Sequence, residues 1–144
     1  MPESRPCIFC EIVAGRVAEA IVLEDAAHIA FFALEHINPG HLLLIPKRHT
    51  DYLFDMQAAG YHALWAAAAR LAPGLRSVTS ALRIGVVVEG FRVPHVHVHL
   101  VPLYARDELN PTRAKPLDAA EAERLRNLLR HEFAALTEPD LDPS

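Results

Sequence analysis

The segment VPHVHVHLVPL, residues 93–103, constrains the fold of this chain more than any other stretch. Histidines alternate there with aliphatic residues, in the order His95, Val96, His97, Val98, His99 and Leu100. Because successive side chains of a strand point to opposite faces, this alternation predicts a strand with its imidazoles on one face and an apolar inner face. Neighbouring imidazoles would lie about 6.5–7 Å apart and the outer two about 13 Å apart, at roughly 3.3 Å per residue. Two neighbours can therefore share one metal ion, but all three cannot easily do so.

The residues alone leave three interpretations of these histidines open. A polar surface strand is the first, although the unbroken apolar inner face argues against it. A metal site with the histidines as ligands is the second, and it is weakened because the next acidic residues, Asp107 and Glu108, follow only after Pro102. The third is nucleophilic catalysis on phosphorus, in which a neutral imidazole attacks without first losing a proton. Crowding by the neighbouring imidazoles opposes protonation, so the middle residue, His97, is the natural nucleophile.

Short apolar runs elsewhere predict four more strands. The second and third runs are separated by Asn38-Pro39-Gly40, a turn signal because proline presets φ and glycine tolerates a positive φ. The first three strands therefore form an antiparallel meander, and Pro46 ends the third of them because it has no N–H to donate. The predicted strands lie at residues 20–23, 28–34, 41–46 and 82–88.

Helical spacing predicts a long helix after the third strand and another near the C-terminus. The first covers residues 57–72 and is interrupted at Pro73-Gly74, with a second helical stretch over 75–81. The C-terminal helix follows Asp118, which with Glu121 resembles a capping box. Its apolar side is predicted to consist of Leu125, Leu128, Leu129, Phe133 and Leu136.

Composition limits the class of protein. The chain has 144 residues, and 51% of them are hydrophobic, which predicts one globular domain over residues 1–144 with a frayed end at 137–144. The 14 basic residues are outnumbered by 18 acidic ones and are not clustered, so we expect no nucleic-acid partner. The chain shows neither an N-terminal signal segment nor an apolar run approaching ~20 residues, so we expect no membrane partner and a cytoplasmic location.

The two cysteines, Cys7 and Cys10, allow more than one interpretation. They are too few and too close together to stabilise a secreted fold. A thioredoxin-like redox motif would open a helix after a strand, and no strand is predicted before residue 7. Free thiols without a role and a zinc half-site completed by histidines both remain open.

Four sequence blocks together resemble the histidine triad (HIT) family of nucleotide hydrolases and transferases. HVHVHLV at 95–101 matches the family's signature, and CIFCEIVAGRV, VLEDAAHIAFF and NPGHLLLIPKRH resemble its earlier blocks in the expected order. The resemblance covers roughly residues 7–103 and leaves a helical tail at about 117–136 outside it. The resemblance implies an α+β fold, with an antiparallel five-stranded sheet and helices, and a homodimer. It also implies a nucleotide substrate, with a purine expected, and no organic cofactor.

The resemblance also implies roles for individual residues. The nucleophile that forms a nucleotidyl-histidine intermediate would be His97, with His99 and His41 facing the same phosphate and backbone N–H groups around His97 holding its oxygens. Walls of the base pocket would be Ile29, Phe31 and Ile37. A structural zinc ion would be bound by Cys7, Cys10, His49 and His95, which leaves the other two triad histidines for phosphate.

The chain departs from the family pattern at three places. Ala33 stands where an aspartate commonly binds the ribose hydroxyls, and Val88 stands where an asparagine is usual. The loop before the triad is the shorter FRVP, with Arg92 as its one polar side chain. We therefore expect weak ribose discrimination and, through the fixed charge of Arg92, a preference for anionic leaving groups. A catalytically weak nucleotide-binding module and a metalloenzyme with triad ligands remain the alternatives.

Overall fold

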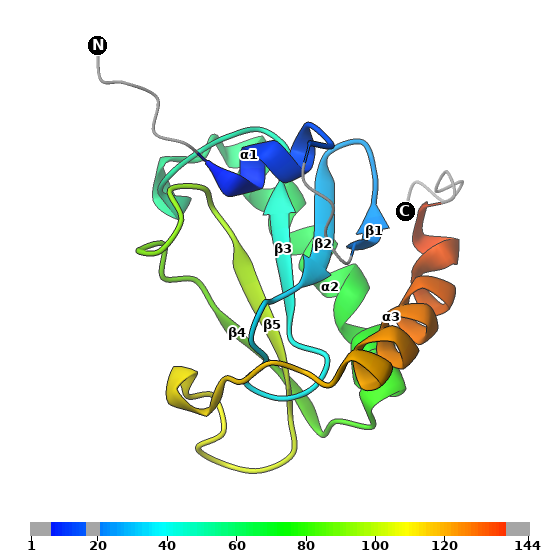
Figure 1. Ribbon diagram of the computed structural model, residues 1–144. Helices are drawn as coiled ribbons and strands as arrows, with labels where there is room; N and C mark the ends of the chain where they lie inside the picture. The colour runs from blue at the N-terminus through cyan, green and yellow to red at the C-terminus, as the bar shows by residue number, and fades with distance from the viewer. Residues whose placement is uncertain (1–6, 17–20, 138–144) are drawn as a thin grey trace.

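A computed structural model describes residues 7–16 and 21–137 and shows an α+β fold built on one antiparallel sheet (Figure 1). The sheet has five strands in the order β1-β2-β3-β5-β4, so the first three form the predicted meander. The strands are β1 (Ile21–Glu24), β2 (His28–Phe32), β3 (Leu42–Pro46), β4 (Arg83–Val87) and β5 (Val98–Leu103). Short 3-10 turns lie at η1 (Leu53–Asp55), η2 (Pro111–Arg113) and η3 (Ala134–Thr137).

Alternate residues of the strands build separate cores on the two faces of the sheet. On β2, Ala30 and Phe32 join the larger core beneath the long helix, whereas Ile29 and Phe31 face the short N-terminal helix. Val96, Val98 and Leu100 all belong to the larger core, as the alternation predicts. The opposite face of this segment is therefore the one that carries the histidines.

The long helix after the third strand, α2 (Ala58–Thr79), runs unbroken through Pro73, so the predicted interruption and the separate stretch over 75–81 are wrong. A proline inside a helix costs about 3 kcal/mol because it lacks an N–H and crowds the preceding turn. The buried side chains of Leu71 and Leu75 flank it and pack into the larger core, and this packing offsets the cost. The absence of a side chain at Gly74 lets the C-terminal helix pack closely on the long helix, because a Cβ there would lie only 3.0 Å from Cε1 of Phe133.

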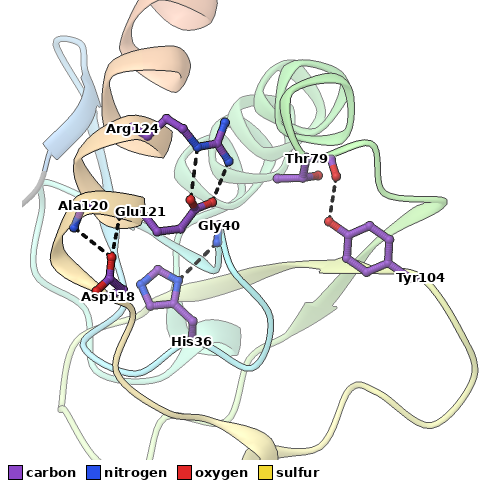
Figure 2. Close-up of polar contacts among 8 residues, drawn as sticks. All are labelled: His36, Gly40, Thr79, Tyr104, Asp118, Ala120, Glu121 and Arg124. Atoms are coloured by element: carbon purple, nitrogen blue, oxygen red, sulfur yellow. Dashed lines mark hydrogen bonds and ion pairs between the residues drawn. The ribbon is translucent and has the colours of Figure 1, made fainter.

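The C-terminal helix, α3 (Ala119–Phe133), begins after Asp118 as predicted. Figure 2 shows the Asp118 carboxylate accepting hydrogen bonds from the backbone N–H groups of Ala120 and Glu121. The Glu121 side chain pairs with Arg124, so the capping box is only half formed. Leu128 is 42% exposed, contrary to prediction, because helical spacing places it beside the buried stripe. The buried stripe consists of Leu125, Leu129 and Phe133, and it packs on α2 and β1.

Two further features differ from the sequence-based predictions. A short helix, α1 (Ile8–Val13), lies across one end of the sheet and was not predicted (Figure 1). The last strand begins only at Val98, so His95 and His97 lie before β5 and outside its pairing with β3 and β4. The predicted frayed end falls almost entirely outside the described residues.

Across residues 7–16 and 21–137, no helix combines the length and the apolar character needed to cross a bilayer.

Candidate functional site

Three histidines meet on the face of the sheet that carries α1. His99 lies opposite Leu43 on β3, and Leu43 lies opposite Phe31 on β2, so these side chains form one row across the sheet. His41, two residues before Leu43, points to the same face, and its Nε2 lies 2.9 Å from Nδ1 of His99. The ring of His97 is 5.1 Å from the ring of His99. The turn and the strands thus bring the three predicted catalytic histidines together.

Backbone contacts determine which nitrogen of His97 is free. Nδ1 of His97 lies 2.7 Å from the carbonyl oxygen of His95, which can only accept a hydrogen bond. Nδ1 must therefore carry the proton, and Nε2 of the neutral ring keeps its lone pair. Burial lowers the pKa of His97, so the ring is neutral at neutral pH. A neutral imidazole with an available Nε2 is the form that a nucleophile requires.

The same reasoning assigns the protons of His41 and His99. Nδ1 of His41 accepts a hydrogen bond from the backbone N–H of Ile37 at 3.1 Å, so its proton lies on Nε2 and is donated to Nδ1 of His99. Burial lowers the pKa of His41 to about 3, and burial together with the nearby His97 and Arg92 lowers that of His99 to about 4. Both rings are therefore neutral, and Nε2 of His99 is left as an N–H donor beside His97.

A further buried histidine, His36, supports this group from the turn before β3. Its Nδ1 accepts a hydrogen bond from the backbone N–H of Gly40 at 3.3 Å (Figure 2). Its ring lies 6.3 Å from the ring of His41, edge to face. Gly40 has a φ of +98°, and a Cβ there would lie 2.9 Å from Cγ2 of Thr79. The turn that delivers His41 therefore needs glycine at this position.

A second group of titratable side chains lies beside α1. Cys7, Cys10, His49 and His95 each offer a ligand atom, and all four atoms lie within 4.8 Å of one another. Sγ of Cys10 is 3.2 Å from Nδ1 of His49, and Sγ of Cys7 is 3.5 Å from Nδ1 of His95. The two Nδ1 atoms are 3.2 Å apart. We call these four residues the Cys–His cluster.

The separations in the Cys–His cluster fit a tetrahedral ion. Bond lengths of about 2.0–2.1 Å for Zn–N and about 2.3 Å for Zn–S place two nitrogens ~3.3 Å apart and a nitrogen and a sulfur ~3.6 Å apart. The structure has 3.2 Å between the nitrogens and 3.2–3.6 Å between nitrogens and sulfurs. Burial and the neighbouring Cys7 thiol raise the pKa of Cys10 to about 11, so an ion must displace a thiol proton as it binds.

The proton on His95 also suits a ligand role. Nε2 of His95 lies 2.8 Å from the carbonyl oxygen of Pro46 and so donates its proton there, which leaves Nδ1 free to face the cysteines. Among the residues described, the Cys–His cluster is the one group of histidines, cysteines or acids with this proximity, and it contains only the first triad histidine. This division favours different roles within the triad over a metal ion bound by all three.

The predicted nucleotide-binding residues differ in burial. Ile29 and Phe31 are only 1% and 2% exposed and pack beneath α1, so they lie in the second core. Ile37 is also buried and contacts His41 through its backbone N–H. Arg92 is exposed and, with Val93 and Pro94 of the loop, borders a cavity against α1. The remaining residues around that cavity are Cys7, Ile8 and Glu11.

Several contributors to the site were not predicted from the sequence. His36 lies five residues before His41, a spacing that signals neither strand nor helix periodicity. The carbonyl groups of Pro46 and His95 are backbone atoms, which no side-chain pattern marks. Phe9 packs edge to face on His97, with ring centroids 5.0 Å apart. Its place between Cys7 and Cys10 was the one feature of the sequence that could have indicated a role near the site.

Known proteins resemble this chain in sequence and in fold. The HIT domain family model matches residues 14–106. An uncharacterised HIT-like protein of Mycobacterium tuberculosis is 30% identical over 117 residues, which cover 78% of this chain and 81% of that protein. A zinc-bound histidine triad family protein from Mycobacterium smegmatis has a TM-score of 0.76 at 28% identity, over 90% of this chain and 94% of that one. A HIT family hydrolase from Legionella pneumophila Philadelphia 1 has a TM-score of 0.59 at 29% identity, over 67% of this chain and 91% of that one. The family model covers more than half of the chain, the fold agrees with the solved structures, and the chain belongs to the HIT domain family.

Proposed function

We propose that the protein is a nucleotide hydrolase or nucleotidyl transferase that works through a covalent intermediate on His97. The observation that carries this proposal is the hydrogen bond from Nδ1 of His97 to the carbonyl of His95, which leaves Nε2 as a free lone pair next to His99. The HIT family hydrolase of Legionella pneumophila supports the same class of reaction.

The proposed reaction has two displacements at phosphorus. In the first, Nε2 of His97 forms a bond to the α-phosphorus while the bond to the leaving group breaks and the leaving group departs with the electron pair. In the second, water attacks the phosphorus, gives its proton to solvent or the product, and displaces His97 with the nitrogen lone pair restored. An acceptor other than water makes the same reaction a transfer. The Nε2–H of His99 and backbone N–H groups near His97 would stabilise the charged phosphate oxygens, with His41 holding His99 in its proton-donating form.

We propose that the Cys–His cluster binds a structural zinc ion. The support lies in the two sulfur and two nitrogen donors, their tetrahedral separations and the Nε2 proton of His95 donated to Pro46. The similar histidine triad family protein from Mycobacterium smegmatis is itself zinc-bound, which supports the proposal. Such an ion would tie α1 to the segment around His49 and to the start of the triad.

The proposed substrate choice rests on Arg92, on Ala33 and on the predicted base-pocket residues. We propose that Arg92 stabilises an anionic leaving group, as in a dinucleoside polyphosphate, because this exposed cation lies in the loop just before the triad and borders a cavity there. The methyl side chain of Ala33 offers no acceptor to a ribose hydroxyl, so we expect similar use of ribose and deoxyribose substrates. Ile29, Phe31 and Ile37 would form the apolar wall for the base, which we expect to be a purine. Ile29 and Phe31 are almost fully buried, so they would support this wall from within the core.

We further propose a homodimer in the cytoplasm. β4 is an edge of the sheet, and two apolar side chains at it, Leu82 and Val86, are 64% and 43% exposed. An edge with apolar side chains can pair with a second copy. The cytoplasm keeps cysteines reduced, as a thiolate-ligated ion requires.

Turnover of a substrate panel tests the proposed function. Wild type should hydrolyse a dinucleoside polyphosphate or a nucleoside phosphoramidate, and His97→Ala should lose at least a hundredfold in kcat/KM with the fold retained. His62→Ala, which removes an exposed histidine from α2, is the matched control and should keep wild-type rates. Activity of His97→Ala within about tenfold of wild type, only ~1.4 kcal/mol of barrier, would refute the assignment. Tight nucleotide binding with no turnover by wild type would instead favour a nucleotide-binding module.

A further inference from the structure

The part of the triad that contains His97 is not held by the sheet. β5 starts at Val98, which lies opposite Leu44 on β3. The preceding residues are held instead by contacts with the last residue of β3 and with the segment that follows it. The backbone N–H of Val96 donates to the carbonyl of Thr50 at 2.7 Å, and Nε2 of His95 donates to the carbonyl of Pro46 at 2.8 Å. The position of His97 therefore depends on how residues 95 and 96 are fixed to residues 46–50.

His95 connects the Cys–His cluster directly to His97. Its ring belongs to the cluster: Nδ1 of His95 lies 3.2 Å from Nδ1 of His49 and 3.5 Å from Sγ of Cys7. Its carbonyl oxygen accepts the hydrogen bond from Nδ1 of His97. One residue thus offers a ligand atom through its side chain and sets the proton position of His97 through its backbone. A shift that takes the His95 carbonyl away from His97 would remove the contact that keeps the proton on Nδ1.

Phe9 makes a second connection from the cluster to His97. It lies between Cys7 and Cys10 in α1, where Sγ of Cys7 accepts a hydrogen bond from the backbone N–H of Cys10. Its ring packs edge to face on His97 at 5.0 Å and on His95 at 6.0 Å. α1 has only six residues, and so short a helix has little stability of its own. A metal ion on both cysteines would fix the helix and, with it, the ring that covers His97.

We propose that metal binding at the Cys–His cluster orients the imidazole of His97 for attack, with Phe9 and the His95 carbonyl as the two contacts that transmit the effect. Phe9 is then a positioning residue that need not touch the substrate. The inference rests on the proposed function, because it takes His97 as the nucleophile and the cluster as the zinc site. It goes further in making the occupied cluster a determinant of the reaction rate as well as of stability.

Nitrogen-15 NMR of the histidine rings at one fixed pH tests this orientation without turnover. In zinc-loaded wild type, His97 should give the signals of a single ring form with its proton on Nδ1. Removal of zinc with a chelator should give exchange broadening or a mixture of the two neutral forms, and added zinc should restore the single form. Phe9→Leu should retain one zinc per chain and still show the mixed or broadened signals.

Single-turnover kinetics give the second measurement. Phe9→Leu should slow formation of the nucleotidyl adduct at least tenfold, while the dissociation constant of the mononucleotide product changes by less than about threefold. Phe133→Leu in α3 makes the same substitution in the core on the other face of the sheet. It should lower the melting temperature without altering the His97 signals or the adduct rate.

Three results would overturn the inference. The first is a His97 signal that stays the same in the zinc-free and the Phe9→Leu proteins. The second is an equal change in Phe133→Leu, which would mean that general stability is responsible. The third is weaker nucleotide binding by Phe9→Leu with an unchanged adduct rate, which would make Phe9 part of the base pocket. Absence of any adduct in wild type would count against the proposed function and leave the NMR result standing. Absence of metal binding would refute the proposed zinc site and this inference, and would leave the proposed role of His97 as nucleophile untouched.

Discussion

The buried histidine His36 should make the fold sensitive to mild acid. Its side chain is only 4% exposed, its ring packs edge to face on Phe32 at 5.2 Å, and its Nδ1 accepts the Gly40 N–H (Figure 2). Burial lowers the pKa of His36 from 6.5 to about 4. The folded chain therefore keeps this ring neutral over a pH range in which the unfolded chain protonates it.

The sign and the size of the effect follow from these two pKa values. Because the folded pKa is depressed, the contribution to stability is fully present above about pH 6.5 and is lost as pH falls towards 4. Between pH 7 and pH 5 the unfolded state takes up a proton that the folded state does not, which lowers the free energy of unfolding by about 2 kcal/mol. By pH 4 the loss approaches ~3 kcal/mol.

Urea denaturation of wild type and His36→Gln at pH 7, 6 and 5 measures this contribution. Glutamine keeps an acceptor for the Gly40 N–H but does not titrate. Between pH 7 and pH 5 the free energy of unfolding of His36→Gln should therefore fall by about 2 kcal/mol less than that of wild type. The metal ligands and the other histidines are common to both proteins and cancel in the difference. His131→Gln, which makes the same substitution at an exposed position of α3, is the matched control. Parallel pH curves for wild type and His36→Gln would refute the reasoning.

The remaining predictions concern the metal, the leaving group and the helix packing. Chelation of zinc or Cys10→Ser should lower the melting temperature by ~10 °C or more, because several kcal/mol of binding free energy are lost; one zinc per chain should be found beforehand, and an unchanged melting temperature would contradict the site. Arg92→Ala should reduce kcat/KM at least tenfold for a dinucleoside polyphosphate and much less for a nucleoside phosphoramidate; equal reductions would remove Arg92 from leaving-group recognition. Gly74→Ala should destabilise the fold by about 1–3 kcal/mol, because the new methyl group meets Phe133, whereas Gly60→Ala in the open first turn of α2 should stabilise it by about 0.5–1 kcal/mol. Chemical denaturation of both glycine variants checks the difference, and the same sign for the two would contradict the packing.

Sequence patterns predicted the strands and helices in which apolar residues recur at the spacing needed to bury one face in the core. The antiparallel sheet followed from short apolar runs and from the turn at Asn38-Pro39-Gly40, because each run had to bury at least one face. The helix boundary at Pro73 was wrong, since local propensity was outweighed by the packing of Leu71 and Leu75 on either side. α1 was missed because six residues are too few for a helical pattern to emerge.

The sequence predicted which side chains form the site, but it did not predict which ring nitrogen of each histidine carries the proton. Alternation placed Val96, Val98 and Leu100 in the core, and the family resemblance named the residues that the structure brings together on the opposite face. The proton positions depend on backbone carbonyls and N–H groups, including those of Pro46, His95 and Ile37. Their locations result from the whole fold, and no single stretch of sequence encodes them.

Intact-mass analysis of the protein after rapid mixing with substrate tests the covalent intermediate most directly. The sample should be quenched at alkaline pH, because phosphorus–nitrogen bonds of histidine are labile in acid. Wild type should gain the mass of one nucleotidyl group, peptide mapping should place it on His97, and His97→Ala should gain none. A substrate that turns over with no adduct at any mixing time, or an adduct on another residue, would contradict nucleophilic catalysis by His97.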